Sequence, residues 1–185
     1  MTNPSRRGGG VVLRPIRPDD YGTMFAWSND PDLVAPFDRF QVDSFDRFRA
    51  GIESAGDDPT SLAPRFAVER VDTGRLIGFV GHYHGHPVLE FVDIWYVLGV
   101  PSERGQGFGR EAVRLLVDHL FATTSVERVG ASCDVDNPPS YRLLEGLGFR
   151  REGTFRSALF HHGRWHDVHQ YGVTRPEWPR APSTA

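Results

Sequence analysis

The sequence contains one cysteine in 185 residues, which excludes an internal disulfide framework and fits a reducing compartment. No apolar run approaches the ~20 residues of a membrane span, and the N-terminus lacks the apolar core of a signal peptide. We therefore expect a cytoplasmic protein with no membrane partner. The sequence also lacks a strong net charge, because 24 acidic and 21 basic residues leave a formal charge of −3, which argues against nucleic-acid binding.

The length and composition predict one globular domain. A chain of 185 residues with 39% hydrophobic content can bury a core, and no internal repeat is present. Residues 1–10 are polar with three consecutive glycines, and residues 176–185 carry three prolines. We expect the first segment to be flexible, the last to be a tail, and residues 11–175 to form the domain.

Periodicity predicts alternating strands and helices along this domain. Strands are expected at 11–17, 65–71, 76–83, 88–100, 128–135, 149–160 and 166–173, and helices at 20–29, 45–54, 108–123 and 140–146. Hairpins require antiparallel pairs, and the strand–helix–strand passage requires a parallel pair. The pattern predicts an α+β fold: a mixed, mostly antiparallel sheet of about seven strands with helices on both faces.

The stretch Arg104-Gly-Gln-Gly-Phe-Gly109 lies between an apolar strand and an amphipathic helix. Alternate glycines let the backbone turn tightly, and the following helix N-terminus presents unpaired N–H groups, a combination that binds phosphate. A nucleotide-triphosphate loop would end in Gly-Lys-Ser/Thr, and a dinucleotide loop would have G-x-G-x-x-G spacing; neither pattern fits. A glycine-rich turn without ligand is the remaining alternative.

A second motif follows about 30 residues later. It reads Asn137-Pro-Pro-Ser140-Tyr141, continues as a short helix and ends in Gly148-Phe149. With Arg104, Gly107 and Gly109, it resembles the two signatures of the GCN5-related N-acetyltransferases, and the resemblance covers about residues 11–175. Near the C-terminus, Trp165-x-Asp167 and Glu177-Trp178 are similar to the ribosomal-protein N-terminal acetyltransferase branch, named RimJ/RimL-like.

The resemblance implies that acetyl-CoA donates an acetyl group directly to a primary amine, without an acyl-enzyme. It implies an oxyanion-binding backbone N–H and pantetheine pairing in the strand before the loop, and pyrophosphate binding in the loop. The implied cofactor contacts are Val97, Leu98, Gly99, Arg104, Gly105, Gln106, Gly107, Phe108, Gly109, Arg110, Asn137 and Ser140. Cys133 is interpreted as a buried small residue rather than a nucleophile.

The proton-transfer groups have alternatives. Ser140 matches the family's hydroxyl position and Tyr141 is its neighbour, so either is a candidate acid, although Ser140 could simply cap the helix. Asp93 and Glu90 are candidate bases on opposite faces of one strand, and Asp93 matches the family position better. A water chain could replace a direct base, and an arginine could simply pair with Asp93.

The sequence indicates less clearly which residues would contact the acceptor amine. Trp165 and Asp167 could shape the acceptor pocket or simply close a hairpin. His82, His84 and His86 alternate on one strand, and we interpret His82 and His84 as substrate-facing rather than as metal ligands. The expected acceptor is a protein or peptide N-terminus ahead of a small metabolite or antibiotic amine. The alternative is an inactive acyl-CoA sensor of the same fold, and either a monomer or a homodimer is compatible.

Overall fold

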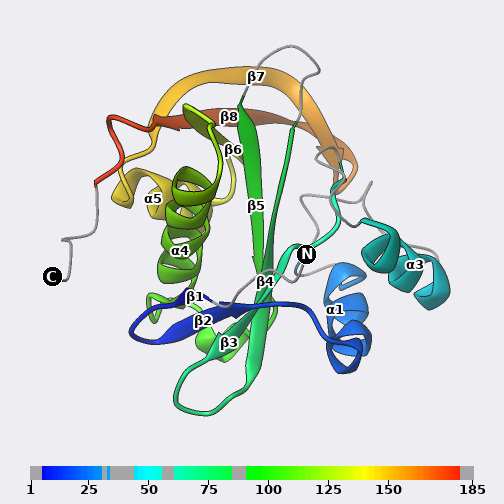
Figure 1. Ribbon diagram of the computed structural model, residues 1–185. Coiled ribbons are helices and arrows are strands. Elements are labelled where there is room, and N and C mark those ends of the chain that lie inside the picture. The colour runs from blue at the N-terminus through cyan, green and yellow to red at the C-terminus, as the bar shows by residue number, and fades with distance from the viewer. Residues whose placement is uncertain (1–5, 31–32, 34–43, 56–60, 85–90, 180–185) are drawn as a thin grey trace, which may run out of the picture.

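The computed structural model describes residues 6–30, 33, 44–55, 61–84 and 91–179. One mixed sheet runs through the molecule, with its strands in the order β1-β2-β3-β4-β5-β6-β8-β7 (Figure 1). The strands are β1 (Arg6–Arg7), β2 (Val11–Arg14), β3 (Phe66–Arg70), β4 (Leu76–Tyr83), β5 (Val92–Leu98), β6 (Arg128–Asp134), β7 (Arg150–His161) and β8 (Arg164–Thr174). The helices are η1 (Pro18–Asp20), α1 (Tyr21–Ser28), α3 (Phe45–Ala55), η3 (Pro101–Glu103), α4 (Phe108–Thr123) and α5 (Pro138–Gly146).

Two hydrophobic clusters cover opposite faces of the sheet. The larger cluster joins β5 and β6 to α4 and α5 through side chains such as Ile94, Ala131 and Leu116. The smaller joins the opposite face of β4 and β5 to α1 and α3 around Met24 and Phe79. In Figure 1, α4 and α5 accordingly lie on one side of the central strands, and α1 and α3 on the other. The predicted α+β fold with helices on both faces is confirmed.

The parallel pair of β5 and β6 is short, and this positions the site. The two strands pair only at Val92↔Val129, Asp93↔Gly130 and Ile94↔Ala131. β5 nevertheless continues to Leu98, still paired with β4, and β6 continues to Asp134, still paired with β8. Beyond residue 94, therefore, β5 has lost its neighbour on the β6 side, and the strands separate towards their C-terminal ends.

Both termini contribute more to the fold than the sequence led us to expect. Arg6–Arg7 forms β1 on β2, and the Gly9 and Gly10 amides donate to the Glu111 carboxylate in the first turn of α4. At the other end, the Trp178 side chain is 6% exposed and its indole N–H donates to Asp118 at 2.7 Å. The expectation that residues 6–10 and 176–179 lie outside the fold is wrong, because contacts with α4 hold both segments.

Local sequence accounts for the helix boundaries. The buried Asp20 carboxylate accepts the Arg17 amide at 2.7 Å and binds the Arg14 guanidinium, which fixes the entry to α1. In α5, Pro138 occupies the first turn, where no N–H is required, and the Asn137 side chain accepts the Ser140 amide. No helix in the described part of the chain has the length and apolar character needed to cross a membrane.

Candidate active site

The glycine-rich loop enters α4 through left-handed backbone. Gly105 has a φ of +74° and Gly107 a φ of +91°, conformations that favour glycine. Gly107 is the N-cap of α4, and because it has no side chain, it leaves the first amides of the helix to an external acceptor. The helix dipole is positive at the same point. This end of α4 therefore fits a phosphate group.

Side chains of this loop and of the first turn of α4 bind backbone carbonyls of neighbouring segments. The Arg104 guanidinium donates to the Leu98 carbonyl at 3.3 and 3.2 Å, and the Gln106 amide donates to the Ser102 carbonyl at 2.5 Å. Arg110 donates to the Gly146 carbonyl at the end of α5. These contacts of the long side chains hold the shape of the loop.

A buried carboxylate that the sequence analysis missed anchors the loop from below. Glu103 is 5% exposed and accepts from the Arg70 guanidinium at 2.9 Å. The same guanidinium lies over the Phe108 ring, 4.9 Å from its centroid. These residues are 33 and 38 positions from Arg70, so no sequence spacing reveals the contact.

Two other glycines are required by close packing. A Cβ on Gly99 would lie 2.0 Å from the Trp27 indole, and one on Gly109 would lie 3.1 Å from Leu98. The Trp27 indole therefore packs directly against the Gly99 backbone. The Gly99 amide donates to the Ile77 carbonyl of β4, so it is engaged. Because backbone groups alternate along a strand, Leu98 turns its N–H and C=O towards the side that β6 has left.

On the α4 and α5 face of this opening lies a hydroxyl pair. The Ser140 hydroxyl is 2.8 Å from the Tyr96 hydroxyl, and Tyr96 is contributed by β5. Burial raises the pKa of Tyr96, although its bond to Ser140 opposes the shift. Cys133 is buried nearby on β6, and burial raises the pKa of its thiol to about 11, which fits the predicted structural role. Tyr141, by contrast, packs its ring against His169, with centroids 6.1 Å apart.

Asp93 lies on the opposite face, at the last paired rows of β5 and β6. Its carboxylate covers Gly130, where a Cβ would meet it at 2.1 Å. Burial raises the pKa of Asp93, and the charge of Arg128 opposes that shift. Arg128 binds Glu152 through both guanidinium nitrogens. Glu90, the other candidate base, lies outside the described residues, as does His86.

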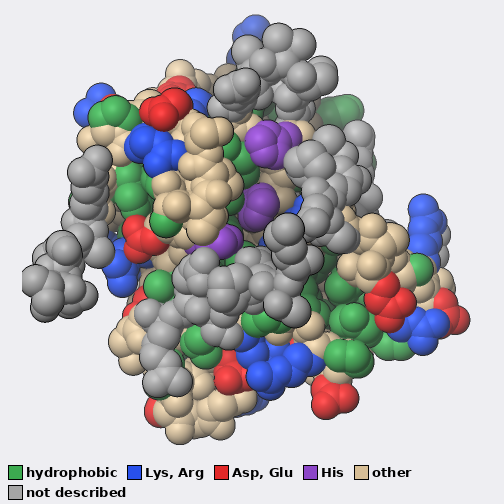
Figure 2. Space-filling model, viewed as in Figure 1, with side chains coloured by type: hydrophobic (Ala, Val, Ile, Leu, Met, Phe, Trp, Pro, Cys, Tyr) green, Lys and Arg blue, Asp and Glu red, His purple; other side chains and the backbone are tan. Residues whose placement is uncertain are grey.

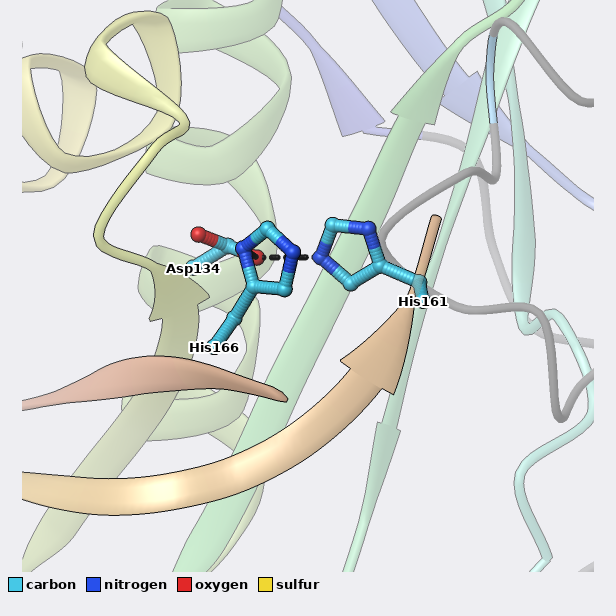
Figure 3. A group of neighbouring side chains, drawn as sticks. All are labelled: Asp134, His161 and His166. Carbon is cyan, nitrogen blue, oxygen red and sulfur yellow. Dashed lines mark hydrogen bonds and ion pairs between the residues drawn. The ribbon is translucent and has the colours of Figure 1, made fainter. Parts of the chain in front are cut away.

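A second polar group on this face combines three strands. Asp134 ends β6, and the His161 and His166 imidazoles reach its carboxylate from β7 and β8 (Figure 3). His161 Nε2 is 2.6 Å from Asp134 Oδ2, and His166 Nδ1 is 3.3 Å from the same oxygen and 3.1 Å from Asp136 Oδ2. All three residues of this Asp–His–His cluster are buried. Sequence spacing does not reveal the cluster, because 27 positions separate Asp134 from the nearer histidine, His161.

Burial raises the pKa of the Asp134 carboxyl, but the Asp136 amide and the hydrogen bond from His161 outweigh burial, so its pKa is below the usual value. The two imidazole rings stack, with centroids 3.6 Å apart and an interplanar angle of 19°. His166 Nε2 is buried and has no hydrogen-bond partner among the described residues.

The predicted acceptor contacts are dispersed rather than gathered. His82 pairs with Ile94, so its side chain lies on the α4 face, away from Asp93; burial lowers its pKa to about 4. His84 follows β4 and is half-buried. Trp165 is 54% exposed in the β7–β8 hairpin, and Asp167 accepts the Ser157 amide at 2.9 Å, which holds a bulge in β7. Figure 2 shows histidine side chains along the middle of one face of the molecule.

Comparisons with known proteins agree with this geometry. The family described as "Acetyltransferase (GNAT) domain" matches residues 11–150. An uncharacterized N-acetyltransferase, YoaA, of Bacillus subtilis is 26% identical over 167 residues, which cover 90% of this chain and 94% of the relative.

Two solved structures extend the comparison. Spermidine N-acetyltransferase from Vibrio cholerae, in complex with CoA and spermine, superposes with a TM-score of 0.81 at 22% identity, covering 92% of this chain and 98% of that one. Mycobacterium smegmatis RimJ, in complex with CoA-disulfide, gives a TM-score of 0.76 at 26% identity, covering 97% and 89%. The predicted family, enzyme class and acyl donor are confirmed: this chain belongs to the GNAT family of N-acetyltransferases, whose acyl donor is acetyl-CoA.

Proposed function

We propose that this enzyme acetylates a primary amine by direct attack on acetyl-CoA, and that its preferred acceptor is a protein or peptide N-terminus, ahead of a small metabolite or antibiotic amine. The observation that carries the proposal is the separation of β5 from β6 beside the N-terminus of α4. The loop amides of residues 105–109 would hold the pyrophosphate. The Leu98 backbone would pair with the pantetheine arm, and Asn137 would fix the strand end from which that arm leaves.

The two faces of the opening support a division of roles. On the α5 side, the Ser140 hydroxyl with its Tyr96 partner would protonate the leaving thiolate. Asp93, on the other face, would attract a cationic amine, and it stands where the family resemblance implies an acidic residue. Cys133 does not enter this scheme because a buried thiol with a pKa of about 11 is protonated at neutral pH.

The preference for an α-amine rests on the chemistry of the acceptor. An α-amine titrates near about 7.7–8.0 and a lysine amine near about 10.4, so at cellular pH only the first is substantially neutral. The RimJ-like neighbour supports a protein N-terminus, and the spermidine acetyltransferase neighbour supports a small amine as the runner-up.

A competition assay tests the acceptor class. The enzyme receives acetyl-CoA and an equimolar mixture of a free-N-terminus peptide without lysine, an N-acetylated lysine peptide, spermidine and an aminoglycoside, and products are quantified by mass spectrometry. This chain contains no lysine, so acetylation of its own lysines cannot obscure the result. We expect the free N-terminus to be acetylated fastest. Preference for the lysine peptide would contradict the α-amine proposal, and no turnover with any amine would favour the sensor alternative.

A further inference from the structure

We propose that His166 is the general base of this enzyme and that Asp134 and Asp136 position it and attract the ammonium form of the acceptor. The proposal rests on the proposed acetyl transfer to an amine and deepens it, because it assigns the proton acceptor at the same opening. Asp93, which the family resemblance favours, then has an electrostatic role.

The Asp–His–His cluster lies beyond the paired part of β5 and β6. Ala131 is the last β6 residue paired with β5, and Asp134 is three positions further, where the strands have separated. Val129, Ala131 and Cys133 belong to the core under α4 and α5. Because strand side chains alternate, Asp134 points to the opposite face. Asp93 shares that face, but it pairs with Gly130, about 13 Å back along the strand at 3.3 Å per residue.

The hydroxyl pair and the cluster therefore lie on opposite faces of one opening. Ser140 and Tyr96 are on the side of α5 and the α4 core, whereas Asp134 and His166 are on the other. Acetyl transfer needs a proton delivered to the departing sulfur and another removed from the attacking nitrogen. Placing the two groups on opposite faces of the gap gives each reacting atom its own partner.

Two carboxylates lie beside one ring nitrogen of His166. Its Nδ1 lies 3.3 Å from Asp134 Oδ2 and 3.1 Å from Asp136 Oδ2, so the proton of the ring is held at Nδ1. Nε2 then carries a lone pair, as in a catalytic triad, where a carboxylate on one ring nitrogen prepares the other as a base. This Nε2 is buried and has no partner among the described residues, an arrangement that costs free energy unless a ligand donor satisfies it.

Carboxylates predominate among the charged groups around His166. Asp134 and His161 face it within the cluster, and Asp136 binds both it and the Arg164 guanidinium, the latter at 2.7 Å. Two carboxylates, of Asp134 and Asp136, and one guanidinium, of Arg164, thus lie around His166. A primary ammonium, with N–H donors and a positive charge, complements both the carboxylates and the Nε2 lone pair.

The reaction balances as follows. His166 Nε2 takes one proton from the ammonium, and the neutral nitrogen attacks the thioester carbonyl so that a C–N bond forms. The C–S bond breaks as the carbonyl reforms, the Ser140–Tyr96 pair protonates the thiolate, and the second proton lost by nitrogen restores that pair. The imidazolium releases its proton to solvent, so the net products are amide, CoA and one proton.

The cluster's geometry favours this role over a metal site. A metal bound by three ligands would place the donors around a common centre, about 2.0–2.2 Å from each. Here one oxygen, Asp134 Oδ2, lies within hydrogen-bonding distance of His161 Nε2, at 2.6 Å, and next to His166 Nδ1. Asp134 Oδ2 thus accepts a hydrogen bond from His161, whereas the hydrogen bond of His166 Nδ1 goes to Asp136 Oδ2.

The test compares His166→Gln with Asp93→Asn, using the amine that the wild-type enzyme acetylates best. His119→Gln, on α4 across the sheet, is the matched control. We expect His166→Gln to bind CoA as tightly as wild type in calorimetry and to lower kcat/KM by about 10²–10⁴-fold, the range for loss of a general base. Because the test uses whichever amine is accepted, it remains valid if the preference for α-amines fails.

Two readouts separate a base from a structural residue. With an acceptor whose amine is already neutral at the assay pH, the loss in His166→Gln should shrink and the acid limb of its kcat/KM–pH profile should flatten. Equal losses for all acceptors, an unchanged acid limb, or a full loss in Asp93→Asn with His166→Gln active would overturn the proposal. Activity lost on dialysis against a chelator and restored by zinc would also overturn it, by assigning the cluster to a metal.

Discussion

Gly107 allows a direct test of whether the loop binds CoA through its phosphates. With φ at +91°, a side chain there strains the backbone, but an added Cβ would have no heavy atom within 4 Å. Left-handed backbone costs an L-residue about 1–2 kcal/mol, and Asn and Asp tolerate it best. Gly107→Asn and Gly107→Asp should therefore fold with similar losses of stability and differ by one negative charge at the N-terminus of α4.

The expected difference between these variants is electrostatic. Two like unit charges about 6 Å apart repel by about 0.7 kcal/mol in water and about 3 kcal/mol at an effective dielectric constant near 20. We therefore expect Gly107→Asp to bind CoA about 3- to 100-fold more weakly than Gly107→Asn, and the gap to narrow as salt is raised. Calorimetric titration with CoA at low and high salt measures it, with thermal melts confirming that both variants fold. Equal Kd values for the pair at low salt would refute phosphate binding at this loop.

Three further predictions concern the acid, the thiol and the C-terminal segment. Ser140→Ala should lower kcat about 10²–10⁴-fold with little change in CoA affinity, whereas Tyr141→Phe should stay near wild type; the reverse pattern in steady-state kinetics would reassign the acid. The Cys133 thiol, buried with a pKa of about 11, should react with a thiol reagent at pH 8 far more slowly in the native than in the urea-unfolded protein, and a fast native reaction would contradict its burial. Trp178→Ala should lower the free energy of unfolding by about 3–5 kcal/mol in denaturant titrations, whereas Trp165→Ala, at a residue 54% exposed, should change it little; similar losses would refute the packing of this segment on α4.

Local sequence determined the elements of the fold. The repeat of apolar residues fixed α4 at Phe108–Thr123 as predicted, and Gly74 in a left-handed turn between β3 and β4 fixed a hairpin. The turns at Gly105 and Gly107 were predictable because each depends on a few neighbouring residues. The expected cap at Ser140 is wrong, because α5 begins at Pro138 and Asn137 caps it. Two such motifs in the right order are enough to identify the family.

Only the tertiary structure decided which distant side chains meet. Glu103 binds Arg70, and Trp178 donates a hydrogen bond to α4. Asp134 lies against two histidines of the β7–β8 hairpin, which returns beside β6 (Figure 3). Their encounters depend on strand order and register, because a shift of one residue would turn a side chain to the other face of the sheet. His82 illustrates the same point: its spacing suggested a substrate contact, but the register with β5 turns it towards α4. Periodicity records which residues are buried in an element, whereas the fold alone determines what they are buried against.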